Sequence, residues 1–181
     1  LRRSIIQEAA CLTFVRGSDL AHVAEAFGAV ASSGRELDID EFCEEAFANQ
    51  EKYPMVALKQ LGDWVLVVED GGEQGRRPEV LRRAAESTAV SVFWDGSGLT
   101  RFSHAARGEL RTAFEAVLPE FREGTDPDGL EELRVDLPWS QADPVALMLA
   151  LAGRITGLPA SPGGLAGPLR TFAVAPWPDD L

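Results

Sequence analysis

Cysteine and histidine are scarce in this sequence, and neither occurs in a pattern that catalysis or metal binding requires. The two cysteines, Cys11 and Cys43, form no C-x-x-C motif and have no partner at metal-ligand spacing. A disulfide framework is therefore not expected, and a reducing, cytoplasmic compartment is the default. The two histidines, His22 and His104, lie outside any G-x-S-x-G motif. Ser103 precedes His104, but neighbours along a strand point to opposite faces, so the two cannot form a catalytic dyad.

Long apolar runs are also missing. The most apolar stretch, residues 145–152, is far shorter than the roughly 20 residues that cross a bilayer. The apolar run near the start of the chain stops at Gln7 and Glu8, so neither a signal peptide nor a membrane partner is predicted. The chain begins without methionine, and we therefore expect it to be trimmed or cut from a longer protein.

Basic residues are outnumbered, with 17 Lys and Arg against 29 Asp and Glu, which gives a formal net charge of −12. This charge repels phosphate backbones, so no nucleic-acid partner is predicted. The same charge would steer a basic protein partner toward the chain. With 181 residues, of which 45% are hydrophobic and 25% charged, the chain has the composition of one globular domain.

Five helices are predicted from their start signals, each an N-cap residue or an early proline. The clearest has Asp38 as N-cap and Glu41 three residues later, with an apolar stripe that ends at Phe47. Another begins with Ser18 as its N-cap and ends at Gly28. The remaining three are expected over residues 78–86, 126–133 and 143–157.

Strands are predicted from short apolar runs that turn signals separate. Residues 64–68 have no polar side, so this strand should lie in the centre of a sheet. The other expected strands cover residues 11–15, 55–61, 89–94, 99–103, 110–114 and, as an edge strand, 170–174. We predict a single α+β domain over residues 1–181, less regular from about 120, with a mostly antiparallel sheet of about 5–7 strands and packed helices. A parallel pair between residues 64–68 and 89–94 would make that sheet mixed.

Several segments carry a resemblance that covers about residues 8–120. They are CLTFVRG at 11–17, WVLVVEDG at 64–71, RPEVLRR at 77–83, SVFW at 91–94 and LTRFS at 99–103. Together they resemble an uncharacterised actinobacterial family, a domain of unknown function abundant in Streptomyces-like bacteria. The resemblance implies a bacterial, intracellular protein and assigns no catalytic residue. The preference for arginine, with lysine only at Lys52 and Lys59, fits a GC-rich bacterial genome.

A glycine-rich segment between a buried strand and a helix is the first candidate site. Backbone N–H groups and a helix N-terminus can cradle phosphate in such a place. The residues that would bind are Gly71, Gly72, Gly75, Arg76 and Arg77. The spacing matches neither G-x-G-x-x-G nor the P-loop, and Pro78 lacks an N–H donor, so a plain surface loop is the stronger interpretation.

Acidic groups and two tryptophans are the second candidate site, for a protein partner. The acidic residues are Glu41, Glu44, Glu45, Asp126, Asp128, Glu131 and Glu132. Trp139 and Trp177 each lie beside proline, where tryptophan either pins a loop to the core, which we favour, or anchors a partner. The run from Asp126 resembles a calcium loop, but its twelfth position is Leu137 instead of Glu, so no metal is predicted.

These patterns favour a non-catalytic intracellular protein-interaction module, by analogy immunity-like or regulatory, with no cofactor and a partner that is another, basic protein. The alternative is a small-molecule or phosphate binder, or an enzyme, that uses the Gly71–Arg77 loop with Glu69 or Asp70 as base or metal ligand. A third hypothesis is a purely structural domain of a larger protein. The oligomeric state stays open.

Overall fold

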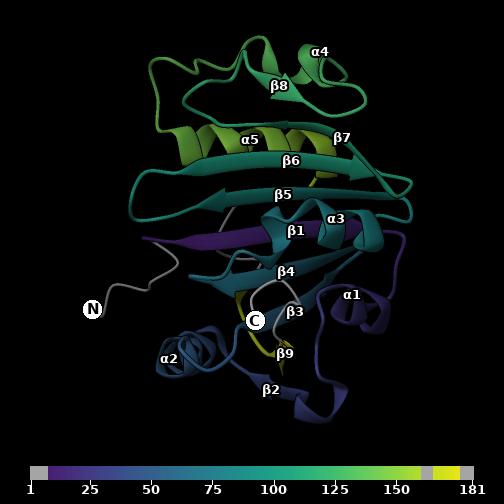
Figure 1. The fold of residues 1–181 in the computed structure, drawn as a ribbon, viewed down its shortest axis with the longest axis vertical. Coiled ribbons are helices and arrows are strands. Elements are labelled where there is room, and N and C mark those ends of the chain that lie inside the picture. The colour runs from purple at the N-terminus through teal and green to yellow at the C-terminus, as the bar shows by residue number, and fades with distance from the viewer. Residues whose placement is uncertain (1–7, 160–164, 176–181) are drawn as a thin grey trace.

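Nine strands join into one sheet in the computed structural model, which describes residues 8–159 and 165–175 (Figure 1). The strand order is β2-β9-β3-β4-β1-β5-β6-β7-β8, and every neighbouring pair is antiparallel. The strands are β1 (Ala10–Arg16), β2 (Arg35–Leu37), β3 (Met55–Leu61), β4 (Trp64–Asp70), β5 (Thr88–Trp94), β6 (Thr100–Ala106), β7 (Glu109–Phe114), β8 (Arg122–Glu123) and β9 (Leu169–Ala173).

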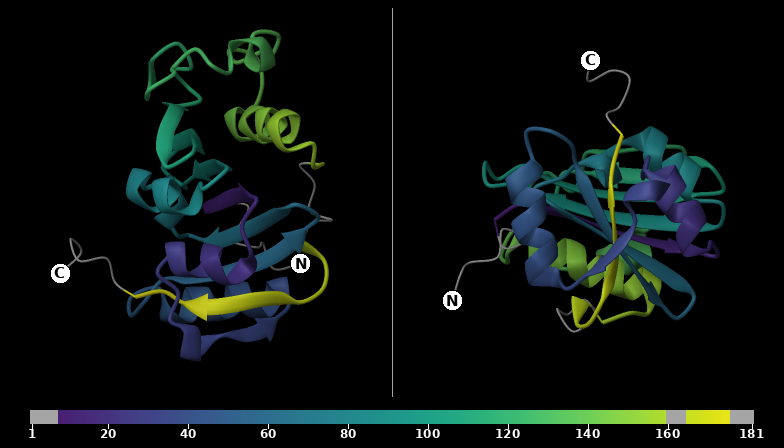
Figure 2. Two further views of the ribbon diagram at one scale, coloured as in Figure 1. Left: turned by 90° about the vertical axis from the view of Figure 1, so that its right-hand side faces the viewer. Right: turned by 90° about the horizontal axis from the view of Figure 1, so that it is seen from below.

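Helices cover both faces of the sheet, as Figure 2 shows. They are α1 (Leu20–Ala26), α2 (Ile39–Asn49), α3 (Pro78–Ala84), α4 (Glu131–Arg134) and α5 (Pro144–Thr156), with short 3₁₀ helices η2 (Ala31–Ser33) and η3 (Gln74–Arg76). The buried side chains of α2 and α5 pack on one face, and those of α1 and α3 on the other. Both faces of β4 are therefore covered, as its uninterrupted apolar sequence predicts.

The predicted fold class, an α+β domain with a mostly antiparallel sheet, is confirmed, but three details of the sheet are wrong. The sheet has nine strands instead of 5–7, partly because β2 and β8 have only three and two residues and so carry no readable alternation. The mixed sheet is also wrong, because β1 lies between β4 and β5 and pairs antiparallel with both. Strand β9 is internal instead of an edge, since β2 pairs with its outer side.

Local capping chemistry explains where the helices begin. Asp38 and Glu41 form the predicted capping box of α2. Helix α1 is capped by Asp19 instead of Ser18, because the Asp19 carboxylate accepts from the N–H of His22 at 2.8 Å. Helix α4 begins at Glu131, five residues later than predicted. Within the described ranges, no helix is long and apolar enough to cross a membrane.

Candidate functional site at the end of strand β4

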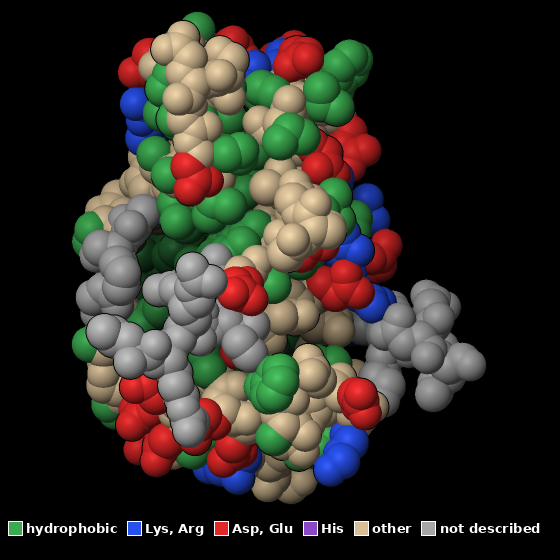
Figure 3. All heavy atoms as spheres, turned by 90° about the vertical axis from the view of Figure 1, so that its left-hand side faces the viewer, with side chains coloured by type: hydrophobic (Ala, Val, Ile, Leu, Met, Phe, Trp, Pro, Cys, Tyr) green, Lys and Arg blue, Asp and Glu red, His purple; other side chains and the backbone are tan. Residues whose placement is uncertain are grey.

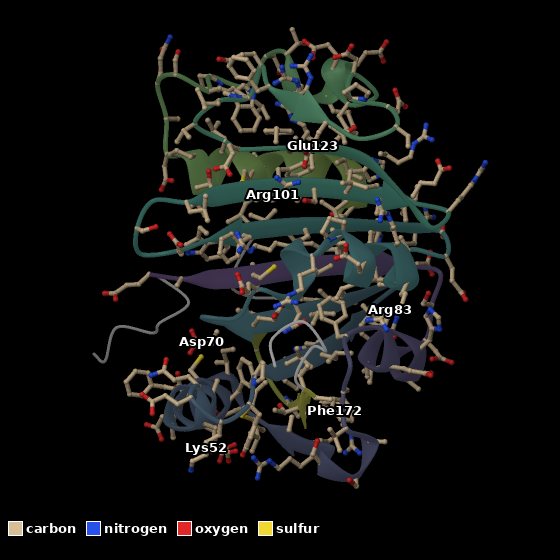
Figure 4. All side chains as sticks on the ribbon, viewed as in Figure 1. Lys52, Asp70, Arg83, Arg101, Glu123 and Phe172 are labelled. Atoms are coloured by element: carbon tan, nitrogen blue, oxygen red, sulfur yellow. The ribbon has the colours of Figure 1, made fainter. Side chains whose placement is uncertain are left out.

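Strand β4 ends in two adjacent acidic residues whose side chains lie on opposite faces of the sheet. Glu69 is fully buried on the face that carries α3, where it lies opposite Cys11 of β1. Asp70 lies toward α2 on the other face (Figure 4). Alternation along the strand thus separates the two carboxylates, so they cannot hold one metal ion together. Among the described residues, no group of three or more His, Cys, Asp or Glu side chains could hold a metal.

The glycine-rich segment after β4 folds over the carboxyl group of Glu69. The backbone N–H of Gln74 donates to Oε2 and that of Gly75 to Oε1, both at 2.7 Å. Amide groups that could have held a phosphate are therefore used by a carboxylate of the protein itself. This arrangement weakens the argument for phosphate binding by the loop.

Close packing explains two of the glycines in this segment. A Cβ at Gly75 would lie 2.8 Å from Sγ of Cys11 and closer still to Oγ1 of Thr13. A Cβ at Gly72 would lie 2.8 Å from Oε2 of Glu69. Only glycine lets the backbone approach the buried carboxylate this closely, so these glycines build the loop instead of a phosphate cradle.

The environment of Glu69 favours its neutral form. Burial raises its pKa to about 7, although the two backbone N–H donors oppose the rise. Burial and the charge of Glu69 also raise the pKa of the Cys11 thiol well above its usual value. A thiol with a raised pKa is a poor nucleophile, so Cys11 is a buried member of a polar cluster with Thr13 and Ser91.

The two arginines of the loop do not converge on a common point. The guanidinium of Arg76 lies 4.9 Å from the ring centroid of Phe93 and 2.7 Å from the carboxylate of Glu73. Arg77 lies 4.0 Å from Glu73 and lines a cleft on the α2 side of the loop. The structure thus brings Gly71, Gly72 and Arg77 together in the cleft and turns Gly75 and Arg76 away from it.

That cleft has a volume of about 200 Å³ and lies between the loop, the end of α2 and the start of β3. Its polar lining includes Asp70, Glu73, Gln74, Gln50 and Tyr53. Burial raises the pKa of Asp70 to about 6, and the nearby Cys43 thiol opposes that shift. The glycine-rich loop can be recognised in the sequence. The sequence does not indicate that Gln50 and Tyr53 line the same cleft, because the fold alone brings these distant residues next to the loop.

The predicted acidic residues fall into two groups at opposite ends of the molecule (Figure 1). Glu41, Glu44 and Glu45 are on α2, while Asp126, Asp128, Glu131 and Glu132 lie beside β8 and α4. Most have internal roles: Glu41 caps α2, Glu45 pairs with Arg35, and members of the second group pair with Arg111, Arg122 and Arg134. They therefore do not form one continuous acidic face.

Trp139 pins its loop to the core, as favoured from the sequence. Its ring packs edge-on against Phe114, with 5.4 Å between centroids, and its N–H donates to the carbonyl of Arg134 at 3.1 Å. Trp177 lies outside the described residues. Phe47, expected to continue the apolar stripe of α2, is instead mostly exposed.

Exposed apolar side chains gather in a segment that no sequence pattern marks. Seven large apolar side chains are exposed in the described chain, and five of them lie between residues 117 and 135. These five are Val117, Leu118, Phe121, Leu133 and Val135. Apolar residues in an irregular segment have no periodicity from which their exposure could be predicted.

The fold and these surfaces define the class of protein: an antiparallel α+β domain in which a glycine-rich loop closes over a buried carboxyl group. Within that class, the chain belongs to DUF6461, a family of unknown function, whose family profile matches residues 1–179. No curated protein and no solved structure matches the chain. Membership confirms the predicted relationship to a domain of unknown function and extends it over almost the whole chain.

Proposed function

We propose that this chain is a non-catalytic protein-interaction module that binds a basic protein through residues 115–136. We call these residues the β7–α4 surface, since they run from the end of β7 through β8 to just beyond α4. The finer form of the proposal is an immunity-like or regulatory role, in which binding controls the activity of the basic partner.

One observation carries this proposal: exposed apolar area and negative charge coincide in the same segment. Residues 115–136 contain eight acidic and two basic side chains, so they carry −6 of the net charge of −12. They also hold Phe121 and Val135, which are 72% and 69% exposed. Figure 3 shows hydrophobic and acidic side chains next to one another at this end of the molecule.

Internal contacts keep this surface in shape. Arg122 of β8 pairs with Asp128 and Glu131, and Arg101 of β6 pairs with Glu123. Glu120 and Glu132 are exposed and have no ion pair with a described residue, so a partner can contact both. An apolar centre with an acidic rim complements a partner with an apolar centre and a basic rim.

Source and compartment belong to the same proposal. The resemblance and the arginine preference support an actinobacterial origin. Two buried free cysteines, Cys11 and Cys43, support a reducing, cytoplasmic compartment. The acidic residues of α2 lie at the other end of the sheet and are not part of the proposed surface.

The test begins by capturing partners from an actinobacterial host at low and high salt and then measures binding of the purified partner. We expect a basic protein whose affinity falls about tenfold or more with Phe121→Ser plus Val135→Ser, since central apolar contacts dominate interfaces. Phe47→Ser is the matched control, because Phe47 is 57% exposed but lies on α2. Unchanged affinity of the double variant, or binding that salt does not weaken, would refute the proposal.

A further inference from the structure

The cleft beside Asp70 contains hydrogen-bond acceptors that lack donors. Both carboxylate oxygens of Asp70 and Oε1 of Gln74 are shielded from solvent, and none accepts a hydrogen bond from an N–H or O–H group of a described residue, although the Cys43 thiol lies beside Asp70. Gln74 is only 3% exposed, and both residues line the cleft. Buried acceptors in folded proteins nearly always have a donor, and the residues that the structure describes supply none with an N–H or O–H group to these three atoms.

The remaining charges of the cleft decide what kind of molecule fits. Glu73 already contacts Arg76 and Arg77, so its charge is largely compensated. Asp70 forms no ion pair with a described residue, and the thiol of Cys43 beside it is only a weak donor. Two carboxylates, Asp70 and Glu73, and one guanidinium, Arg77, line the cleft, so the net charge of its lining is negative. The buried polar atoms of the lining that have no partner are all acceptors. An anion would meet repulsion there, whereas a cation that donates hydrogen bonds would meet matching groups.

The size and walls of the cleft narrow the choice further. Its volume of about 200 Å³ is below the roughly 300–1,000 Å³ of sites for drug-sized ligands. Tyr53, Pro54 and Met55 form an apolar wall that can hold an alkyl stem or the face of a cation. A calcium ion would need six to eight oxygen ligands, which this lining does not assemble around one point.

We propose that this cleft binds a small organic cation, an alkylammonium or alkylguanidinium group, with Asp70 as its counter-ion and Oε1 of Gln74 as a second acceptor. Both groups carry N–H donors and no acceptor, which is the complement of the three open atoms. A guanidinium can also donate to both oxygens of Asp70 at once. Binding needs the ionised carboxylate, so affinity should fall when the pH drops below the Asp70 pKa of about 6. The other ionisable groups that line the cleft are Glu73, Arg77 and Tyr53.

The test is a titration of the ¹⁵N-labelled chain followed by two-dimensional NMR. The probes are butylammonium and butylguanidinium, with butanol and butyrate as neutral and anionic controls of similar shape. We expect saturable shifts of the Gly71 and Gly72 amides and of the Gln74 side-chain amide with the cations, at a Kd of roughly 1 mM or tighter. Neither control should saturate.

Variants of the two acceptors decide the assignment. Asp70→Asn and Gln74→Leu should each weaken the cations about tenfold or more. Asp63→Asn removes the same charge from the turn between β3 and β4 and should bind as the wild type does. Circular dichroism of each variant identifies loss of fold. Asp70→Asn replaces one oxygen by a group of similar size, so it keeps the test decisive if Gln74→Leu unfolds.

Three outcomes would overturn the assignment: no saturable shift with either cation, an equal response to butanol, or unchanged binding by Asp70→Asn. The site is separate from the β7–α4 surface, so Asp70→Asn should leave binding of the protein partner intact. Failure of one proposal can therefore be distinguished from failure of the other.

Discussion

Replacing Glu69 with glutamine should remove a large pH dependence of stability. Glu69 is fully buried, and its pKa rises from the ordinary value of 4.5 to about 7 in the folded chain. A shift of this size corresponds to about 3 kcal/mol between the two protonation states. Because the folded chain holds this proton more tightly than the unfolded chain, the contribution of Glu69 to stability is lost as pH rises from about 4.5 to about 7.

The assay is urea unfolding of the wild type and Glu69→Gln at a series of pH values from about 4.5 to 8. Glutamine cannot ionise, so the stability of the wild type relative to the variant should fall by about 3 kcal/mol across this range. Subtracting the two curves removes the effects of other groups, such as His104, whose pKa burial lowers and whose contribution has the opposite sign. The exposed Glu25→Gln on α1 is the matched control and should follow the wild type.

A difference curve that stays flat within about 1 kcal/mol would refute this reasoning, since it would mean that Glu69 titrates normally in the folded chain. A difference that grows with pH would refute it more strongly. In that case the two backbone N–H donors would outweigh burial, and Glu69 would be a stabilising carboxylate at neutral pH.

Two further predictions concern packing. In thermal unfolding, Gly75→Ala should lower the free energy of unfolding by about 2 kcal/mol or more, because its Cβ would meet Cys11 and Thr13. Gly96→Ala is the control: a Cβ there has nothing within 4 Å, so its free energy of unfolding should stay within about 0.5 kcal/mol of the wild-type value. Equal melting temperatures for the two variants would contradict the close approach. Trp139→Ala should lower the free energy of unfolding in urea by about 2–4 kcal/mol, because it removes the ring packed on Phe114 and the hydrogen bond to the Arg134 carbonyl. A loss below about 1 kcal/mol would show that Trp139 does not hold this loop on the core.

The sequence predicts those elements whose signals are local. The capping box at Asp38, the Pro144 start of α5 and the alternation-free strand β4 each depend on neighbours in the chain, and all three are found in the structure. No local signal shows that β1 lies between β4 and β5, because that position depends on contacts between strands that are distant in the sequence. Without it, β4 and β5 could have been a parallel pair joined by α3. Strand β8 is similarly defined by its partner β7 and by the Arg101–Glu123 pair, since two residues have no pattern of their own.

In the candidate site, too, local signals identify the residues, whereas the contacts of those residues depend on the fold. The sequence identifies the glycine-rich segment, the arginines and the two carboxylates, but the function of each depends on which face of the sheet it meets. Glu69 points to the buried face and takes the backbone amides of the loop, which fixes the position of Gln74. Gln74 and Asp70 line the same cleft, and Oε1 of Gln74 is buried without a donor among the described residues. One carboxylate thus shapes the loop from the buried face, and the other lines the cleft on the opposite face, so the proposed cation site depends on the fold and not on the glycine-rich composition that made phosphate the alternative.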